Sequence, residues 1–192
     1  MSPSDSEHLV KGNVFVTVRD WLTDAHGEAS YQRLLDAMPP EHAREVADPL
    51  PSIWHPETIH QSMLHALHET VCSGDLRRYQ GVIADITVLG VHKFARLILQ
   101  MSSNAFVLRR LPTLWKIIRR GPATTEVDQT RERTQIAYGR FPFYGDALYR
   151  HYILGVLTGI VRTSARMDPT VEVVRYETDR LLVDLRLPVG AG

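Results

Sequence analysis

Cysteine is almost absent from this 192-residue sequence: Cys72 is the single one, so no disulfide can form within the chain. A long apolar run is also missing, because the longest, YILGVLTGIV at residues 152–161, is about half the length that a membrane-spanning helix needs. The first ten residues, MSPSDSEHLV, lack the basic and apolar regions of a secretory signal. These absences predict a protein of the reducing cytoplasm.

Motifs of the common catalytic classes are missing as well. The sequence contains no Gly-x-Ser-x-Gly, no phosphate-binding glycine loop, no closely spaced cysteine pair and no His-Glu-x-x-His. Serine, histidine and aspartate are frequent, but no spacing singles out a catalytic triad. We therefore expect a protein that is not an enzyme and has no catalytic residues.

A net excess of either charge is absent, since 22 Lys and Arg side chains balance 22 Asp and Glu side chains. A chain without a broad basic face is not expected to bind nucleic acid. The distribution is uneven, because residues 1–103 carry 8 basic and 13 acidic side chains. Residues 104–121 contain no acid and five cations: Arg109, Arg110, Lys116, Arg119 and Arg120.

These five cations have two interpretations. They lie in LRRLPTLWKIIRRG, where Pro112 suits the start of a helix and Gly121 its end. In the interpretation that we favour, the last three cations stabilise the negative end of the helix dipole, by roughly 0.3–1 kcal/mol each, and the first two pair with the acidic first half. The alternative is an interaction surface for an acidic protein or, with less support, for an anionic membrane.

The spacing of apolar residues predicts an α+β fold. We expect an N-terminal helical bundle followed by strands, a long helix and a C-terminal β-hairpin that forms a small antiparallel sheet. The single domain is expected at residues 11–188, with a flexible N-terminus at 1–10 and a tail at 189–192. The predicted helices span residues 14–22, 31–38, 56–72, 76–101 and 144–166, and the predicted strands lie within 122–141, at 171–176 and at 181–187.

Several segments resemble a known group of domains. YILGVLTGIVRTSARMDPTVEVVRYETDRLLVDLRL resembles the closing helix and hairpin of the vinyl-four-reductase domain, an architecture shared with heme-NO-binding domains and with the Bet-type subunits of the TRAPP vesicle-tethering complex. KGNVFVTVRDWLTDAHGEASYQRLL resembles the opening helix of the heme-NO-binding domains. With IWHPE and LPTLWKIIRRG added, the chain resembles an uncharacterised myxobacterial family of this group over residues 11–188. The resemblance implies a ligand-binding sensor or a dimerising adaptor.

The resemblance also bears on heme. In heme-NO-binding domains the proximal iron ligand is a histidine on the helix equivalent to LPTLWKII, and the best match in this sequence is Trp115. Indole nitrogen is a donor only and does not ligate iron as imidazole does. The tyrosine-serine-arginine cradle for the heme propionates is incomplete, because Tyr138 and Arg140 are separated by Gly139 alone. We therefore expect the pocket without heme or any other cofactor.

The first functional hypothesis is a sensor or signalling adaptor whose apolar pocket binds a small apolar ligand and passes its state to a protein partner. His60 lies within the apolar arc of the helix at 56–72, so it is either a core histidine that donates to a carbonyl group or a polar group that lines the pocket. The residues expected to line or border the pocket are His60, Val82, Ile86, Phe94 and Trp115.

The second hypothesis is a structural interaction module with a filled core, which forms a homodimer through a helical face. Gly155 and Gly159 leave a flat strip on the last long helix, which serves close packing inside the domain or, in the sharper interpretation, contact with a partner. A weaker third hypothesis is a zinc site. His65, His68 and Cys72 share one exposed face of a helix and are suitable zinc ligands, although no fourth ligand can be identified.

Overall fold

The computed structural model describes residues 8–94, 104–130, 133–165 and 167–187. Four helices and two short strands form the first part of the fold. Pro40 at the first position of α3 and Pro56 just before α4 suit helix starts, where a missing N–H leaves no bond unmade. The elements are β1 (Leu9–Lys11), α1 (Asn13–His26), α2 (Ala29–Asp36), α3 (Pro40–Val46), β2 (Trp54–Pro56) and α4 (Glu57–Thr70).

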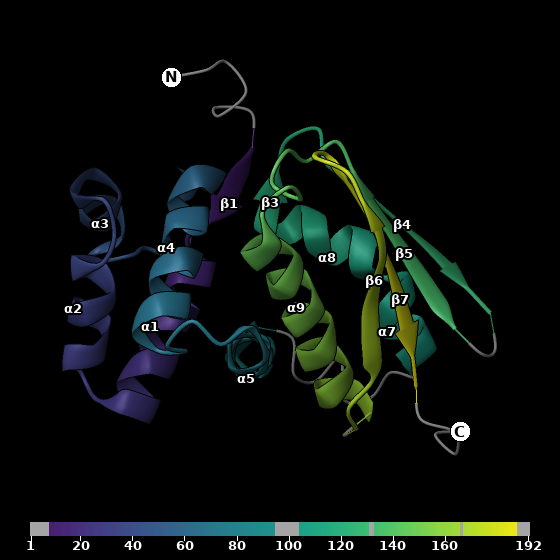
Figure 1. The fold of residues 1–192 in the computed structure, drawn as a ribbon, viewed down its shortest axis with the longest axis horizontal. Helices are drawn as coiled ribbons and strands as arrows, with labels where there is room; N and C mark the ends of the chain where they lie inside the picture. The colour runs from purple at the N-terminus through teal and green to yellow at the C-terminus, as the bar shows by residue number, and fades with distance from the viewer. Residues whose placement is uncertain (1–7, 95–103, 131–132, 166, 188–192) are drawn as a thin grey trace.

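A long helix then leads to the second part of the fold, in which an antiparallel sheet packs against helices (Figure 1). Its four strands are ordered β4-β5-β7-β6, and α9 lies between this sheet and the N-terminal helices. The elements are α5 (Leu76–Phe94), α7 (Asn104–Arg109), α8 (Leu111–Ile118), β3 (Arg119–Arg120), β4 (Thr124–Gln129), β5 (Thr134–Gly139), α9 (Ala147–Ala165), β6 (Thr170–Tyr176) and β7 (Arg180–Arg186). The predicted α+β class is confirmed.

A second sheet joins the two parts of the fold. It has three strands in the order β2-β1-β3, and both pairings are antiparallel. Val10 of β1 is fully buried and lies opposite Arg119 of β3. Residues 8–10, which we expected in a flexible terminus, therefore belong to the packed domain.

Helices α5 and α9 cross at close range. A Cβ atom on Gly155 would lie 2.7 Å from the Cβ of Ile83, and one on Gly159 would lie 2.6 Å from the Cβ of Thr87. These separations leave no room for a side chain, so both glycines are required for the close packing of α5 against α9 within the domain. They are not available for the intermolecular contact that we had considered.

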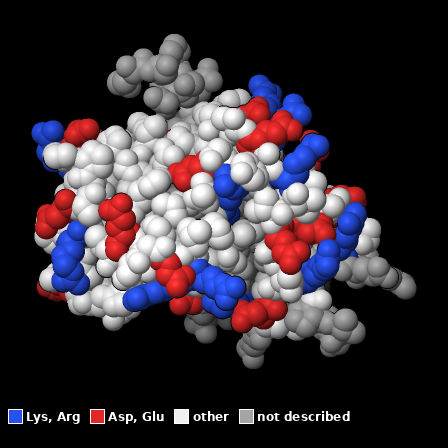
Figure 2. Space-filling view, in the orientation of Figure 1, with Lys and Arg blue, Asp and Glu red and all other residues white. Residues whose placement is uncertain are grey.

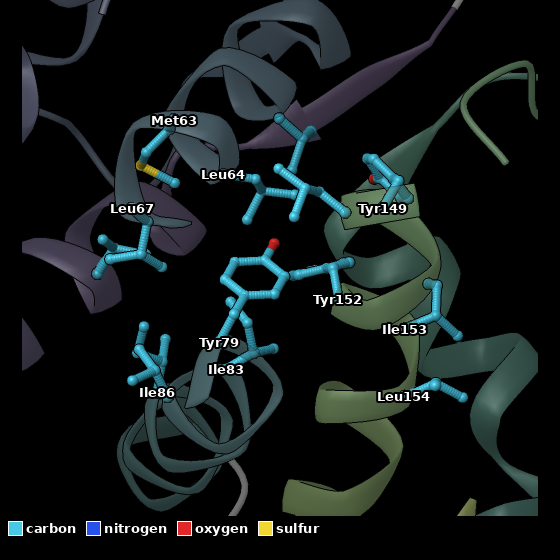
Figure 3. Close-up of a cluster of buried hydrophobic side chains, with 14 of the residues drawn as sticks. Met63, Leu64, Leu67, Tyr79, Ile83, Ile86, Tyr149, Tyr152, Ile153 and Leu154 are labelled. Carbon is cyan, nitrogen blue, oxygen red and sulfur yellow. The ribbon is translucent and has the colours of Figure 1, made fainter. Parts of the chain in front are cut away.

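Large apolar side chains fill the space between α4, α5 and α9 (Figure 3). Met63 and Leu67 of α4 face Ile83 and Ile86 of α5, and all four are buried. Burial of a side chain of this size stabilises a fold by roughly 1.5–3 kcal/mol. None of the helices in the described part of the chain is long and apolar enough to cross a membrane.

Candidate functional site at the junction of the two halves

A buried ion pair connects the two halves of the fold. Glu57 is the first residue of α4, and Arg119 is the first residue of β3; their exposed fractions are 1% and 5%. The Arg119 Nε atom lies 3.2 Å from Glu57 Oε2. Pairing of β3 with β1 brings the guanidinium to this position, because Arg119 lies opposite Val10, two residues from the His8 carbonyl that accepts the backbone N–H of Glu57.

Two tyrosines of α9 complete the surroundings of this pair. Arg119 Nη2 donates to the hydroxyl oxygens of Tyr149 and Tyr152, at 2.9 and 3.2 Å. The Tyr149 hydroxyl donates in turn to Glu57 Oε1. The rings also stabilise the cation, since the Arg119 guanidinium carbon lies 4.4 Å from the centroid of the Trp115 ring. The charges are thus bonded to elements from both halves.

His60 is attached to the same carboxylate. One turn along α4 from Glu57, it is fully buried, and its Nδ1 atom lies 2.6 Å from Glu57 Oε1. Its Nε2 atom is also buried and has no hydrogen-bond partner among the described residues. Because the carboxylate orients Nδ1–H, the lone pair of Nε2 remains free for a ligand.

The protonation states follow from these contacts. Burial favours neutral Glu57, but the charge of Arg119 and the hydrogen bonds from His60 and Tyr149 outweigh burial and lower the pKa of Glu57 to about 2. Burial lowers the pKa of His60, and the adjacent Glu57 only partly offsets this effect. At neutral pH the network therefore holds a carboxylate, a guanidinium and a neutral imidazole.

The predicted pocket residues come from the three helices α4, α5 and α8. His60 and Trp115 both contact this junction, His60 through Glu57 and Trp115 through Arg119. Val82 and Ile86 are buried on α5, and Ile86 lies beside Leu67 in the packed cluster between the helices (Figure 3). The side chain of Phe94 lies outside the described residues. One apolar pocket shared by these residues stays a prediction.

The interpretation of the five cations needs correction. Helix α8 ends at Ile118, so Arg119 and Arg120 lie in β3 and not in a last helical turn. Arg119 is buried and belongs to no interaction surface. Arg109 donates to the Gln129 side chain, and neither it nor Arg110 forms an ion pair with the described residues of the first half. Among the described residues, Arg119 is the one cation of this run that forms an ion pair with that half.

The exposed cations do not form a single-sign surface on the face that is drawn in space-filling form. Figure 2 shows acidic and basic side chains interspersed across that face. Among the exposed residues of the run, Arg110 lies over the Phe106 ring and Arg120 over the Trp54 ring, with 5.1 and 4.1 Å between guanidinium carbon and centroid. Lys116 is exposed. A partner for these cations stays a prediction.

The proposed zinc ligands do not share one exposed surface. His65 is exposed, and its Nε2 atom lies 2.7 Å from Asp146 Oδ2. Cys72 lies beyond the end of α4 and is fully buried, and burial raises the pKa of its thiol to about 11. Across the described ranges, no group of three His, Cys, Asp or Glu residues could hold a metal ion. The expectation of one shared exposed face is therefore wrong.

Sequence reasoning missed Glu57, Tyr149 and Tyr152, and it assigned Arg119 to a helix end or an interaction surface. One local signal was present, because Glu57 and His60 are three residues apart at the start of a helix and therefore share a face. The other three residues come from segments that are 59 to 92 positions away from His60, and nothing in the spacing connects them. Only the paired strands and the position of α9 bring them together.

No family model and no curated protein matches this sequence. Solved structures match its fold. A point mutant of the H-NOX (heme-NO-binding) protein from K. algicida, in the unliganded Fe(II) state, has a TM-score of 0.65 and 11% identity and covers 94% of this chain and 98% of that chain. An H-NOX protein studied for heme distortion has a TM-score of 0.64 and 15% identity, and the alignment covers 93% and 95% of the two chains.

A third match is an oxygen-binding H-NOX domain related to soluble guanylate cyclases, in its oxygen complex. Its TM-score is 0.61 at 15% identity, over 93% of this chain and 95% of that chain. The predicted resemblance to heme-NO-binding domains is thereby confirmed at the level of the fold. The likeness to TRAPP subunits and a role as a dimerising adaptor stay predictions.

These neighbours overturn one expectation. We predicted that no heme is present because Trp115 stands where the resemblance implies the proximal histidine, yet the solved structures with this fold include heme-binding H-NOX domains. The absence of a histidine from α8 is thus not sufficient to exclude heme. Iron ligation from another element has to be considered.

His60 is a described side chain whose chemistry suits iron. Imidazole with a carboxylate on Nδ1 and a free, buried Nε2 is the usual arrangement of a metal-ligating histidine. The space around it is filled, since the ring centroids of Tyr152, Tyr149 and Phe15 lie 5.0, 6.0 and 6.0 Å from that of His60. The donor fits iron, whereas entry of a porphyrin requires that these rings move apart.

Proposed function

We propose that this domain is a ligand-binding sensor that performs no chemistry on its ligand. The ligand binds at the junction of the two halves, next to His60, and changes the hydrogen bonds of the Glu57–Arg119 pair. The observation that carries this proposal is the free, buried Nε2 of His60 within a charged network that contacts α4, β3 and α9.

Heme is the first ligand to test, because the fold neighbours include heme-binding H-NOX domains. In this proposal His60 supplies the iron ligand, and Glu57 orients its imidazole. Heme would supply an iron centre that takes up a small gaseous molecule. Displacement of Tyr149 or Tyr152 would alter the position of α9 relative to α4, and a protein partner would read that change.

The test is titration of the purified chain with hemin under reducing conditions, followed by an absorbance scan. We expect a saturable Soret band for the unaltered chain and its loss, or a clear shift, for His60→Ala. His65→Ala is the matched control, since His65 is on the same helix but exposed. Absence of a saturable Soret band, or an identical band for His60→Ala, would contradict heme binding at this position.

Native mass spectrometry of the protein as purified extends the test to other ligands. A bound mass that disappears in His60→Ala supports the junction as the site, whatever the chemistry of the ligand. A bound mass that persists in His60→Ala contradicts it.

A further inference from the structure

An open hollow of about 640 Å³ lies between α9 and the edge strand β6. Figure 1 shows β6 at the border of the four-stranded sheet, alongside α9. Small-molecule sites commonly have volumes of roughly 300–1,000 Å³, so the hollow is large enough for a ligand. None of the residues that form the junction described above lines this hollow.

The floor of the hollow is apolar. Val171 and Val173 pair with Leu185 and Val183 of β7, whose side chains are buried on the face that α9 covers. The two valines therefore point to that same face, but they remain half-buried because α9 does not cover the edge strand fully. Leu154 of α9 completes this floor.

One cation at the rim is held rigidly. Arg150 Nη1 donates to the carbonyl oxygens of Tyr144 and Gly145, at 2.7 and 2.9 Å. Its guanidinium carbon lies 3.7 Å from the centroid of the Tyr176 ring. The remaining edge of the guanidinium, Nε and Nη2, has no hydrogen-bond partner among the described residues.

A free guanidinium edge on a fixed side chain suits a carboxylate, because two parallel N–H donors match its two oxygens. His151 adds an imidazole to the lining. The lining also contains Glu172, but this residue pairs with Asp184 on β7 and so points to the sheet face opposite the valine floor. Arg175, on that opposite face too, is engaged by Glu177 at 3.9 Å.

We propose that this hollow binds an amphipathic carboxylate, a small molecule with one carboxylate group and an apolar body. The carboxylate is bound by the free edge of Arg150, and the apolar body lies on Leu154, Val171 and Val173. This proposal is independent of ligand binding at His60. The two sites share α9, because Arg150 and His151 lie between Tyr149 and Tyr152 in the sequence of this helix. A ligand in the hollow therefore contacts the same helix that contributes the two tyrosines to the junction.

The experiment is isothermal titration calorimetry of the full chain with octanoate, and in parallel with 1-octanol as the uncharged counterpart. We expect saturable one-site binding of octanoate and binding of 1-octanol that is weaker by about tenfold or more, the effect of losing roughly one charge-assisted hydrogen-bonded pair. Titration with 4-phenylbutyrate distinguishes an aromatic from an aliphatic source of the same carboxylate chemistry.

Two variants locate the site. Arg150→Gln removes the guanidinium, and Val174→Glu places an acid at the rim, on a residue that is 54% exposed and whose replacement leaves the core intact. Both variants are expected to weaken octanoate binding by about tenfold or more. Arg180→Gln, an exposed arginine at the start of the neighbouring strand β7, is the matched control and should leave binding unchanged.

Three results would overturn the proposal. These are octanoate binding that does not saturate in the millimolar range, equal affinity for octanoate and 1-octanol, and octanoate affinity that is unchanged in Val174→Glu. Octanoate binding by an unaltered chain that does not bind hemin would contradict heme binding at His60 and leave this inference standing.

Discussion

Two ion-pair clusters hold α9 in place, one buried and one exposed. In the buried cluster, Arg119 pairs with Glu57, and both touch the tyrosines of α9. In the exposed cluster, Arg162 near the end of α9 lies 3.1 Å from Asp85 of α5, with side chains that are 34% and 57% exposed. The chemistry is the same, but the surroundings differ. Removal of water makes an unpaired charge far more costly in the first cluster than in the second.

The strongest test of this difference is Arg119→Met. Loss of the guanidinium leaves Glu57 buried beside two hydroxyls and a neutral imidazole, and we expect the free energy of unfolding to fall by about 3–5 kcal/mol. Urea denaturation followed by circular dichroism measures this loss. Arg120→Met, next in the same strand but exposed, is the control and should cost less than about 1 kcal/mol.

The double variant Glu57→Met with Arg119→Met sharpens the same point. With both charges replaced by apolar groups, most of the lost stability should return, because the cost lies in the unpaired charge. A double variant as unstable as Arg119→Met alone would show that the hydrogen bonds of the network matter more than its charges.

The pH dependence of the free energy of unfolding is the next test of the buried cluster. The pKa of Glu57 falls from 4.5 to about 2 on folding, so its contribution to stability is complete above pH 4.5 and is lost as the pH falls towards about 2. Urea denaturation at a series of pH values between these limits should show this decline. In Glu57→Gln the decline should be clearly shallower.

The contact between α5 and α9 provides a test of intermediate size. In Gly155→Ala the new Cβ would lie 2.7 Å from Ile83 and 2.8 Å from the carbonyl oxygen of Gln80, so overpacking should destabilise the protein by about 1–3 kcal/mol. Gly81→Ala, a helical glycine with open space around it, is the matched control and should be neutral or stabilising. Thermal unfolding distinguishes the two, and equal melting temperatures would contradict the close approach.

The smallest effect is expected for the exposed cluster itself. Arg162→Met should reduce the free energy of unfolding by no more than about 1 kcal/mol, and by still less at high salt, because solvent screens the pair. A loss comparable to that of Arg119→Met would remove the distinction between the clusters.

Local patterns predicted much of the fold. The apolar spacing along α4, α5 and α9 and the alternation in β6 and β7 are properties of short segments, and these elements formed close to the expected positions. The helix predicted at 31–38 is followed by two prolines, and these prolines also permit the start of α3, which was not predicted. Residues 95–101 of the predicted long helix lie outside the described ranges.

The candidate site was far less predictable. Arg119 follows helix α8 without a break in the charge pattern, so its sequence looks like a helix end with cations that favour the dipole. Its extended conformation comes from pairing with β1, and its burial comes from Glu57 and α9. Such long-range causes leave no periodic signal in a single sequence. The expectation of no heme rested on the absence of a histidine from α8 alone, whereas the buried imidazole with an unpartnered Nε2 lies on α4.

The pairing of β1 with both β2 and β3 has a consequence for the order of events during synthesis. Val10 lies opposite His55, which is 45 residues later, and opposite Arg119, which is 109 residues later. On the ribosome the first strand can pair with β2 early, but one of its edges stays open until more than half of the chain has emerged. When β3 pairs with that edge, Arg119 is placed beside Glu57. The buried carboxylate therefore gains its ion-pair partner only after the second half of the polypeptide has begun to emerge.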